Sequence, residues 1–257
     1  MSRAKEPAHP PGLRRLVTAL GEALGGPDAA WRRRLRRLRR PALLAPFRTR
    51  PASDYWGIDR GTPVDRYFIE RFLAEHRADI RGRVLEVQDT RYAARFGSGV
   101  DRVDVLDLNP ANPLATIVGD LTVPGSVPAD AFDCFVLTQT LQFIYDVRAA
   151  VAQAHRLLKP GGVLLATVPS VSRLAPVYGL EGDYWRFTPA SCAALFGEAF
   201  GPGAVSVRGY GNPRAAIAFL AGLAQEELPR RALEAQDDHF PVIVAARAVK
   251  RGGEARG

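Results

Sequence analysis

Short apolar runs alternate with amphipathic stretches through the middle of the chain. Five of these runs are rich in β-branched residues and leucine and are bounded by polar or turn-forming residues, which predicts buried strands. They cover residues 84–87, 103–106, 116–118, 132–137 and 163–168. A helix is predicted over residues 149–158, between the fourth and fifth strands. Strands that alternate with helices are typical of a doubly wound sheet, so we predict an α/β, Rossmann-like and mostly parallel sheet.

The C-terminal third predicts a different kind of strand pairing. A long loop over residues 169–185 leads to a helix near 189–200. Two strand-like runs follow at 204–210 and 241–249, with a helix at 213–223 between them. Two closing strands after a series of strand–helix units are consistent with an antiparallel hairpin at the edge of the sheet.

The chain divides into three parts. Residues 1–53 form an extension with two predicted helices, over 13–24 and 29–40, and a proline-containing linker at its end. We predict that residues 54–250 form the α/β domain and that residues 251–257 form a disordered tail.

The second predicted helix of the extension is basic and amphipathic. Trp31, Leu35 and Leu38 share one stripe, and seven arginines, ending at Arg40, cover the rest of the surface. Three interpretations are open. The stripe packs on the body of the protein, or the helix from Trp31 to Arg40 binds an anionic membrane surface, or it contacts nucleic acid, which is the least favoured of the three.

Composition places the excess positive charge in this extension. The net charge is +8, and residues 1–50 hold 13 of the 35 basic residues but only 3 of the 27 acidic ones. No apolar run approaches the roughly 18–20 residues that span a bilayer, and the first residues lack the apolar core of a signal peptide. We expect a cytoplasmic protein, peripheral to the inner face of the membrane if the basic helix binds there. Cys134 and Cys192 are far apart, which predicts neither a disulfide framework nor a metal site.

Polar residues follow the predicted strands, at the positions where ligands of parallel sheets bind. They include Gln88, Asp89, Asp107, Asp120, Thr138 and Gln139. Asp107 lies 21 positions after Glu86, at the end of the second strand. An acidic residue at this spacing accepts hydrogen bonds from the hydroxyls of a nucleotide ribose. The glycine-rich turn that usually accompanies it is absent from the first loop.

Four segments resemble class I S-adenosylmethionine-dependent methyltransferases, most closely the group called methyltransferase type 11. They are residues 84–87, 119–121, 132–137 and 157–165. The Leu-Lys-Pro-Gly-Gly turn before the fifth strand is the most specific of them, and Phe-Thr-Pro at 187–189 is similar to a further motif of the group. The resemblance implies the class I fold, S-adenosylmethionine as the cofactor and methyl transfer as the activity.

The resemblance also implies cofactor contacts for individual residues. Glu86 matches the acidic residue of the first family motif, and Asp107 matches the acid that binds the ribose. Asp120 and Leu121 match the pair that flanks the adenine.

The chain departs from the family pattern in the first turn. The family has a glycine-rich turn there, whereas this chain has Gln88 and Asp89. We expect Asp89 to meet the ammonium group of the cofactor directly. Thr138 and Gln139 match the segment beside the methionine moiety and the methyl acceptor.

The loop after the fifth strand is the predicted acceptor side of the site. Residues 178–186 combine carboxylates with aromatic rings suited to a sugar, and Asp183 is the predicted catalytic residue, ahead of Glu181. None of the histidines on the predicted body matches a base position: His76, His155 and His239.

The sequence therefore predicts a methyltransferase that acts on a small-molecule or glycan acceptor. Residues 60–67 resemble a segment of methyltransferases associated with bacterial polysaccharide and cell-surface glycan assembly. The loop over 55–67 is interpreted equally as a lid over the cofactor or as a docking strap. Two other functions stay open. The absent glycines suit a non-catalytic binding or assembly module, and the arginine helix suits a nucleic-acid methyltransferase.

Overall fold

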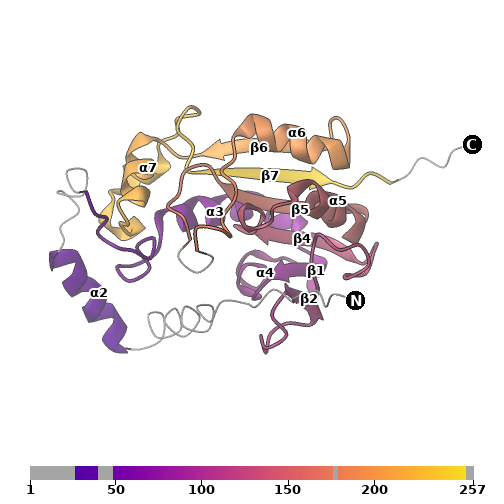
Figure 1. The fold of residues 1–257 in the computed structure, drawn as a ribbon, viewed down its shortest axis with the longest axis horizontal. Helices are drawn as coiled ribbons and strands as arrows, with labels where there is room; N and C mark the ends of the chain where they lie inside the picture. Colours follow the sequence, from indigo (N-terminus) through magenta and orange to yellow (C-terminus); the bar gives the residue numbers. More distant parts are fainter. Residues whose placement is uncertain (1–26, 40–48, 176–178, 253–257) are drawn as a thin grey trace, which may run out of the picture.

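The computed structural model describes residues 27–39, 49–175 and 179–252. Within these residues, seven strands form one sheet in the order β3-β2-β1-β4-β5-β7-β6 (Figure 1). The strands are β1 Gly82–Val87, β2 Val100–Asp107, β3 Ile117–Val118, β4 Phe132–Thr138, β5 Leu158–Pro169, β6 Val205–Tyr210 and β7 Ile243–Val249. All neighbours pair in parallel except β7, which runs antiparallel between β5 and β6. The predicted Rossmann-like sheet with an antiparallel edge pair is confirmed.

Successive side chains of a strand point to opposite faces of the sheet, so apolar strands present an apolar surface on each face. Helices cover both of these surfaces. On one face, Leu85 and Phe135 join the apolar side chains of α5 and α6. On the other face, Val84 and Val136 pack with α3, α4 and α7. The helices are α2 Pro27–Arg39, α3 Val64–Glu75, α4 Arg91–Phe96, α5 Val147–Leu157, α6 Pro189–Phe200, α7 Pro213–Leu220 and α8 Arg230–Glu234. Short 3₁₀ turns are η2 Arg77–Asp79, η3 Leu141–Phe143 and η4 Gln225–Glu227.

Parts of the predicted extension and tail lie outside the described residues. These are the helix predicted over 13–24, most of the linker, Arg40, and residues 253–257 of the tail. No helix in the described ranges has both the length and the apolar character needed to cross a bilayer.

Residues 50–62 form a strap that docks onto the segment around η4. The Ala52 amide donates to the Ala221 carbonyl at 2.7 Å. The Arg60 guanidinium donates twice to the Glu227 carboxylate, at 2.9 and 2.5 Å, and both side chains are almost completely buried. These contacts agree with the docking-strap interpretation of the loop over 55–67.

The basic helix α2 contacts the strap through arginines. Arg36 Nη1 lies 3.0 Å from an Asp59 carboxylate oxygen. Arg37 Nε donates to the Arg60 carbonyl at 2.8 Å, and Arg60 Nη1 donates back to the Arg36 carbonyl at 3.1 Å. These contacts run in both directions between the two segments, so they fix one side of α2 against the body.

The apolar stripe of α2 faces outward. Trp31 is 51% exposed, Leu35 39% and Leu38 70%. Within the described residues, these exposures do not fit an interpretation in which the stripe packs on the body. The arginines take that role because the strap offers carboxylate and carbonyl oxygens, which suit guanidinium donors and not an apolar stripe.

The start of α6 gives a first stability prediction. Thr188 Oγ1 accepts from the Ser191 amide at 3.1 Å and caps the helix. Thr188→Ala should lower the free energy of unfolding by about 1 kcal/mol, because a helix amide then loses its partner. Urea denaturation measures this change. Thr188→Ser keeps the oxygen and should remain close to the wild type, and an equal loss in both variants would contradict the capping role.

Candidate functional site

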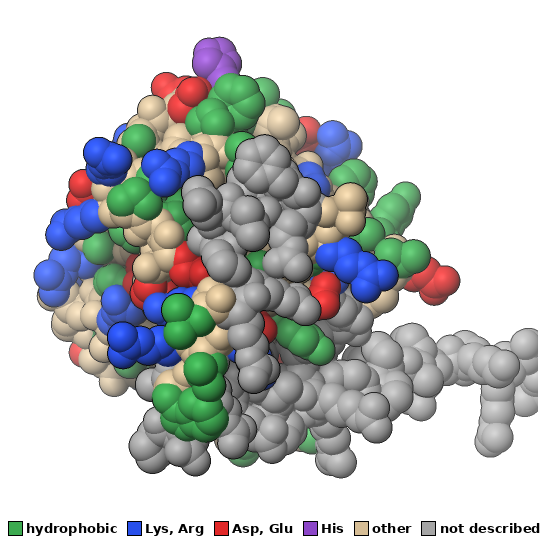
Figure 2. Space-filling model, turned by 90° about the vertical axis from the view of Figure 1, so that its left-hand side faces the viewer, with side chains coloured by type: hydrophobic (Ala, Val, Ile, Leu, Met, Phe, Trp, Pro, Cys, Tyr) green, Lys and Arg blue, Asp and Glu red, His purple; other side chains and the backbone are tan. Residues whose placement is uncertain are grey.

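The carboxyl ends of the parallel strands β1 to β5 meet along one edge of the sheet. This edge lies on the left in Figure 1, and Figure 2 views the molecule from that side. The strand order brings the residues after β3, β2, β1 and β4 next to one another in space. The predicted polar residues at the strand ends, which are Asp120, Asp107, Gln88, Asp89, Thr138 and Gln139, therefore share this edge.

Two non-glycine residues at this edge have left-handed backbones. The φ angle is +70° at Gln88, directly after β1, and +47° at Gln139, directly after the neighbouring strand β4. For a residue with a Cβ this conformation costs roughly 1–2 kcal/mol. Gln88 thus adopts the backbone for which the family uses glycine. Strained residues of this kind concentrate at functional sites.

Asp89 interacts with its own loop. One carboxylate oxygen accepts from the Arg91 amide at 2.9 Å, and the other accepts from the Arg91 guanidinium at 2.8 Å. Both groups of this ion pair are partly exposed. A cofactor ammonium at Asp89 would therefore have to share the carboxylate with the Arg91 guanidinium or displace it.

Glu86 is buried and caps α4, the helix that follows the first turn. Its two carboxylate oxygens accept from the Tyr92 and Ala93 amides, each at 2.9 Å. Burial raises the pKa of Glu86 to about 7, although the two amides favour the charged form. Glu86 therefore fixes the start of α4 relative to β1. The first turn, which connects the two, is held at both ends as a result.

Asp107 is the last residue of β2, and its hydrogen bonds connect the end of β2 to the end of β1. Its Oδ1 accepts from the Asn109 amide at 2.9 Å, and its Oδ2 accepts from Asn112 Nδ2 at 2.8 Å. The same Nδ2 donates to the Gln88 carbonyl at 2.8 Å, so Asn112 links the ends of β1 and β2. Our sequence reasoning missed Asn112, although two Asn-Pro pairs after β2 signal a turn. Each Asp107 oxygen has a second lone pair for a further donor.

Asp120 and Leu121 occupy the turn after β3. Asp120 Oδ1 accepts from the Thr122 amide at 2.7 Å and from the Thr122 hydroxyl at 2.8 Å. Leu121 is buried in the core beneath this turn. Asp120 therefore places a carboxylate at the edge of the sheet, and the buried Leu121 side chain anchors the turn in the core.

Unsatisfied polar atoms gather where β4 and β5 end. Gln139 Nε2, Gln142 Oε1 and Thr167 Oγ1 are buried and have no hydrogen-bond partner within the described part of the chain. Thr167 pairs with Thr138 across the two strands, and its carbonyl accepts from the Gln139 amide at 2.8 Å. A buried polar group without a partner costs about 1–3 kcal/mol. Unsatisfied groups of this kind need an explanation, and they mark the end of β4 as a candidate contact for a polar ligand.

Asp183, the predicted catalytic residue, is buried in the loop after β5. Its carboxylate forms two contacts with the Arg186 guanidinium, at 2.6 and 3.1 Å, and accepts from the Ala175 amide at 2.8 Å. These bonds join distant parts of the loop. For Asp183 to take a proton from an acceptor, its pair with Arg186 would have to open.

Three exposed aromatic rings lie beside this loop. Tyr145 contacts Tyr184 edge-to-face, with 5.4 Å between ring centroids, and stacks on Trp185 at 6.0 Å. The Tyr184 amide donates to the Gln142 carbonyl at 2.8 Å, which ties the cluster to the segment after β4. The sequence pointed to Tyr184 and Trp185 but not to Tyr145, because Tyr145 belongs to a different loop. Exposed rings at a site rim offer flat surfaces for a sugar or a planar ligand.

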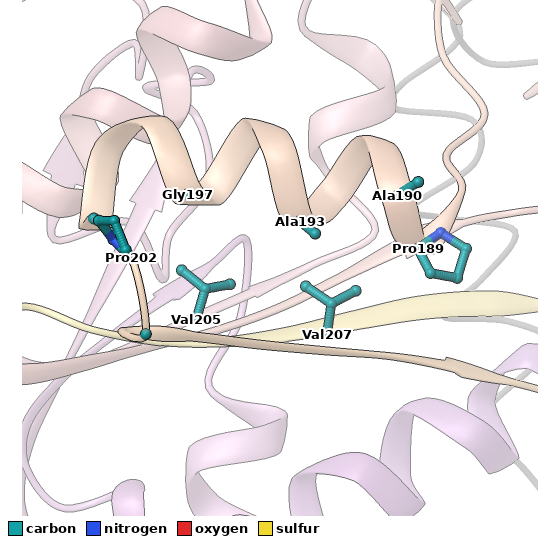
Figure 3. A pocket seen from close by; sticks show the side chains of 9 residues that line it. Pro189, Ala190, Ala193, Gly197, Pro202, Val205 and Val207 are labelled. Carbon is teal, nitrogen blue, oxygen red and sulfur yellow. The ribbon is translucent and has the colours of Figure 1, made fainter.

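A groove of about 470 Å³ lies apart from these residues, between α6 and β6 (Figure 3). Val205 and Val207 of β6 lie below Ala193 and Gly197 of α6. Its lining consists of proline, alanine, glycine and valine side chains. It therefore offers no group for acid–base or nucleophilic chemistry.

A family comparison agrees with the resemblance seen in the sequence. The family model described as a methyltransferase domain, Methyltransf_11, matches residues 86–166, about a third of the chain. This region begins at Glu86 and includes Asp107, Asp120 and the segment after β4. The match agrees with the predicted resemblance to class I methyltransferases over this region. No curated protein sequence matches the chain.

Solved structures that match most of this chain are distant from it in sequence. One is a chain of the complex between the Haloferax volcanii Trm112 methyltransferase activator and a methyltransferase, with 18% identity, 73% of this chain and 92% of that chain covered, and a TM-score of 0.48. A second is a SAM-dependent methyltransferase from Archaeoglobus fulgidus, with 10% identity, 72% and 94% coverage, and a TM-score of 0.48. A third is 1,6-didemethyltoxoflavin-N1-methyltransferase from Burkholderia thailandensis, with 16% identity, 72% and 77% coverage, and a TM-score of 0.46.

Proposed function

We propose that this chain, which carries a class I S-adenosylmethionine-dependent methyltransferase domain, transfers a methyl group to a small-molecule or glycan acceptor at the carboxyl edge of its sheet. The observation that carries this proposal is the left-handed backbone of Gln88 and Gln139, at the ends of the adjacent strands β1 and β4. Neither residue type favours this conformation, and both lie at the edge of the sheet where ligands of parallel sheets bind.

The residues at this edge fit the parts of S-adenosylmethionine. Asp107 would accept hydrogen bonds from the ribose, and Asp120 with Leu121 would flank the adenine. Gln88 and Asp89 would face the amino-acid end of the cofactor. The partner that Gln139 Nε2 lacks supports a polar ligand beside β4.

The chain contributes mainly positioning to this reaction. The bound cofactor supplies a methyl group that its positive sulfur already activates for in-line displacement. Asn112 fixes Asp107 relative to the first turn, and Glu86 fixes α4 beneath that turn. Correct placement and exclusion of water then contribute most of the acceleration.

The acceptor side is proposed at the aromatic cluster of Tyr145, Tyr184 and Trp185. These rings lie beside the segment after β4, next to the residues assigned to the methionine moiety. Asp183 keeps the loop in place through Arg186, and it would act as a base only for an acceptor that opens this ion pair. Aromatic faces next to a carboxylate suit a sugar acceptor.

A non-catalytic binding or assembly module is the second candidate. It is favoured by the ion pair between Asp89 and Arg91, which occupies the carboxylate expected to meet the cofactor. Binding of S-adenosylmethionine separates the two candidates.

Asp107→Ala should weaken S-adenosylmethionine binding by about tenfold or more, because hydrogen bonds to a charged group contribute about 1.5–3 kcal/mol. Isothermal titration calorimetry with the full chain measures this. Asp101→Ala is the matched control, because Asp101 lies near the opposite end of the same strand and is exposed. Its affinity should equal that of the wild type. A wild-type chain that releases no heat with millimolar cofactor would favour the assembly module.

A further inference from the structure

We propose that α2 is a docking helix for an anionic lipid bilayer, which it enters through Trp31, Leu35 and Leu38. This proposal concerns a surface outside the catalytic edge. It depends on how α2 is held, on which side chains it presents and on the charge around them.

The orientation of α2 is fixed by its own arginines. Arg36 pairs with Asp59 at 3.0 Å, and Arg37 lies 3.7 Å from a Glu226 carboxylate oxygen. Arg37 also donates to the Arg60 carbonyl at 2.8 Å. An α-helix turns about 100° per residue, so residues 36 and 37 lie on the side opposite to the stripe. Docking by arginines therefore directs the apolar stripe away from the protein.

The outward stripe has the composition of an interfacial helix. A helix on a globular protein usually turns its apolar side toward the core, and α2 does the reverse. Trp31, Leu35 and Leu38 occupy positions i, i+4 and i+7, and all three are exposed. Arg34, also exposed, lies beside the stripe and not on the docked side. Tryptophan and leucine flanked by arginine are typical of helices that lie in the headgroup region of a membrane.

Charge favours an anionic bilayer over another protein surface as the occupant. Residues 1–50 hold 13 basic and 3 acidic residues, whereas the remainder of the chain has a small acidic excess. Basic residues close to a membrane are attracted to its anionic headgroups. Long arginine side chains can reach these headgroups while the stripe enters the apolar layer.

The position of α2 has a consequence for the acceptor. The helix lies on the same side of the molecule as the carboxyl edge of the sheet (Figure 1). A chain bound through α2 therefore holds this edge near the bilayer. If the proposed function is correct, on which this step rests, the acceptor is amphiphilic or linked to a lipid.

Vesicle flotation of the full chain tests the proposal. The wild type should float with phosphatidylcholine vesicles that contain about a third phosphatidylglycerol, and much less with pure phosphatidylcholine. The triple variant Trp31→Ser/Leu35→Ser/Leu38→Ser should lose the bound fraction roughly tenfold, because no apolar anchor remains. Arg34→Glu should weaken binding to the anionic vesicles less strongly.

Phe240→Asp is the matched control, because Phe240 is as exposed as Trp31 but lies ahead of β7. It should float like the wild type. Equal flotation of the triple variant and the wild type would overturn the proposal, as would a wild type that binds neither vesicle. A concentration-dependent dimer that the triple variant loses, without vesicle binding, would assign the stripe to a second copy. Flotation needs no cofactor, so a chain that floats but does not bind S-adenosylmethionine would refute only the proposed activity.

Discussion

Arg60→Ala is expected to lower the free energy of unfolding by about 3–5 kcal/mol, because it leaves the Glu227 carboxylate buried without its partner. The two side chains are 1% and 5% exposed and lie 2.5 Å apart. Arg60 belongs to the strap, and Glu227 belongs to η4, so the loss also releases the strap from the body. The melting temperature should fall by roughly 10 °C, since each kcal/mol corresponds to about 2–4 °C in a chain of this size.

A double-mutant cycle separates the pair from its surroundings. Arg60→Met combined with Glu227→Met should be less destabilised than the sum of the single variants, with a coupling of about 1–3 kcal/mol, because no charge remains buried. Arg148→Ala removes an exposed ion pair with Glu198 and should leave unfolding unchanged. If Arg60→Ala behaves like Arg148→Ala in urea denaturation, the buried pair does not hold the strap.

The fold was predictable because each strand carries its own signal. The runs at 84–87 and 132–137 are apolar except for Glu86 and Asp133, as expected for strands with both faces largely buried, and they became β1 and β4. The pair of Arg60 and Glu227 was not predictable. The two residues are separated by 167 positions, and the sequence around each of them does not indicate that they form a pair.

The most specific family motifs proved to support the sheet. Asp133 of β4 accepts from Lys159 Nζ at 2.7 Å and from the Arg83 amide at 2.8 Å. Lys159 belongs to the Leu-Lys-Pro-Gly-Gly turn, so two segments of the resemblance are in direct contact at the starts of β4 and β5. Such motifs report the fold reliably, whereas they say little about the acceptor.

The candidate site was predictable only in part. The positions of Asp107 and Gln88 followed from topology, because parallel strands end at one edge. The left-handed backbone of Gln88 did not follow, since a glutamine carries no signal for positive φ. Asn112 and Tyr145 act through contacts between separate loops, which a periodic pattern does not encode.

Glu86 should make the protein less stable as the pH rises from about 4.5 to about 7. Burial raises the pKa of Glu86 from 4.5 to about 7, so the folded state holds this proton more tightly than the unfolded chain does. The stabilisation is complete below pH 4.5 and is lost as the pH rises through 7. The free energy of unfolding should therefore fall by about 3 kcal/mol across this window as a result of Glu86 alone.

The comparison with Glu86→Gln isolates this contribution. The burial of His76 and His155 lowers their pKa values and adds the opposite slope below about pH 6.5, so the wild-type curve alone is insufficient. Glutamine has no charge to titrate, and the difference between the two variants removes the histidine terms. Urea denaturation at half-unit steps from pH 4.5 to 8 should show the wild type losing stability relative to Glu86→Gln as the pH rises. Parallel curves would mean that Glu86 is ionised throughout, held in its charged form by the Tyr92 and Ala93 amides.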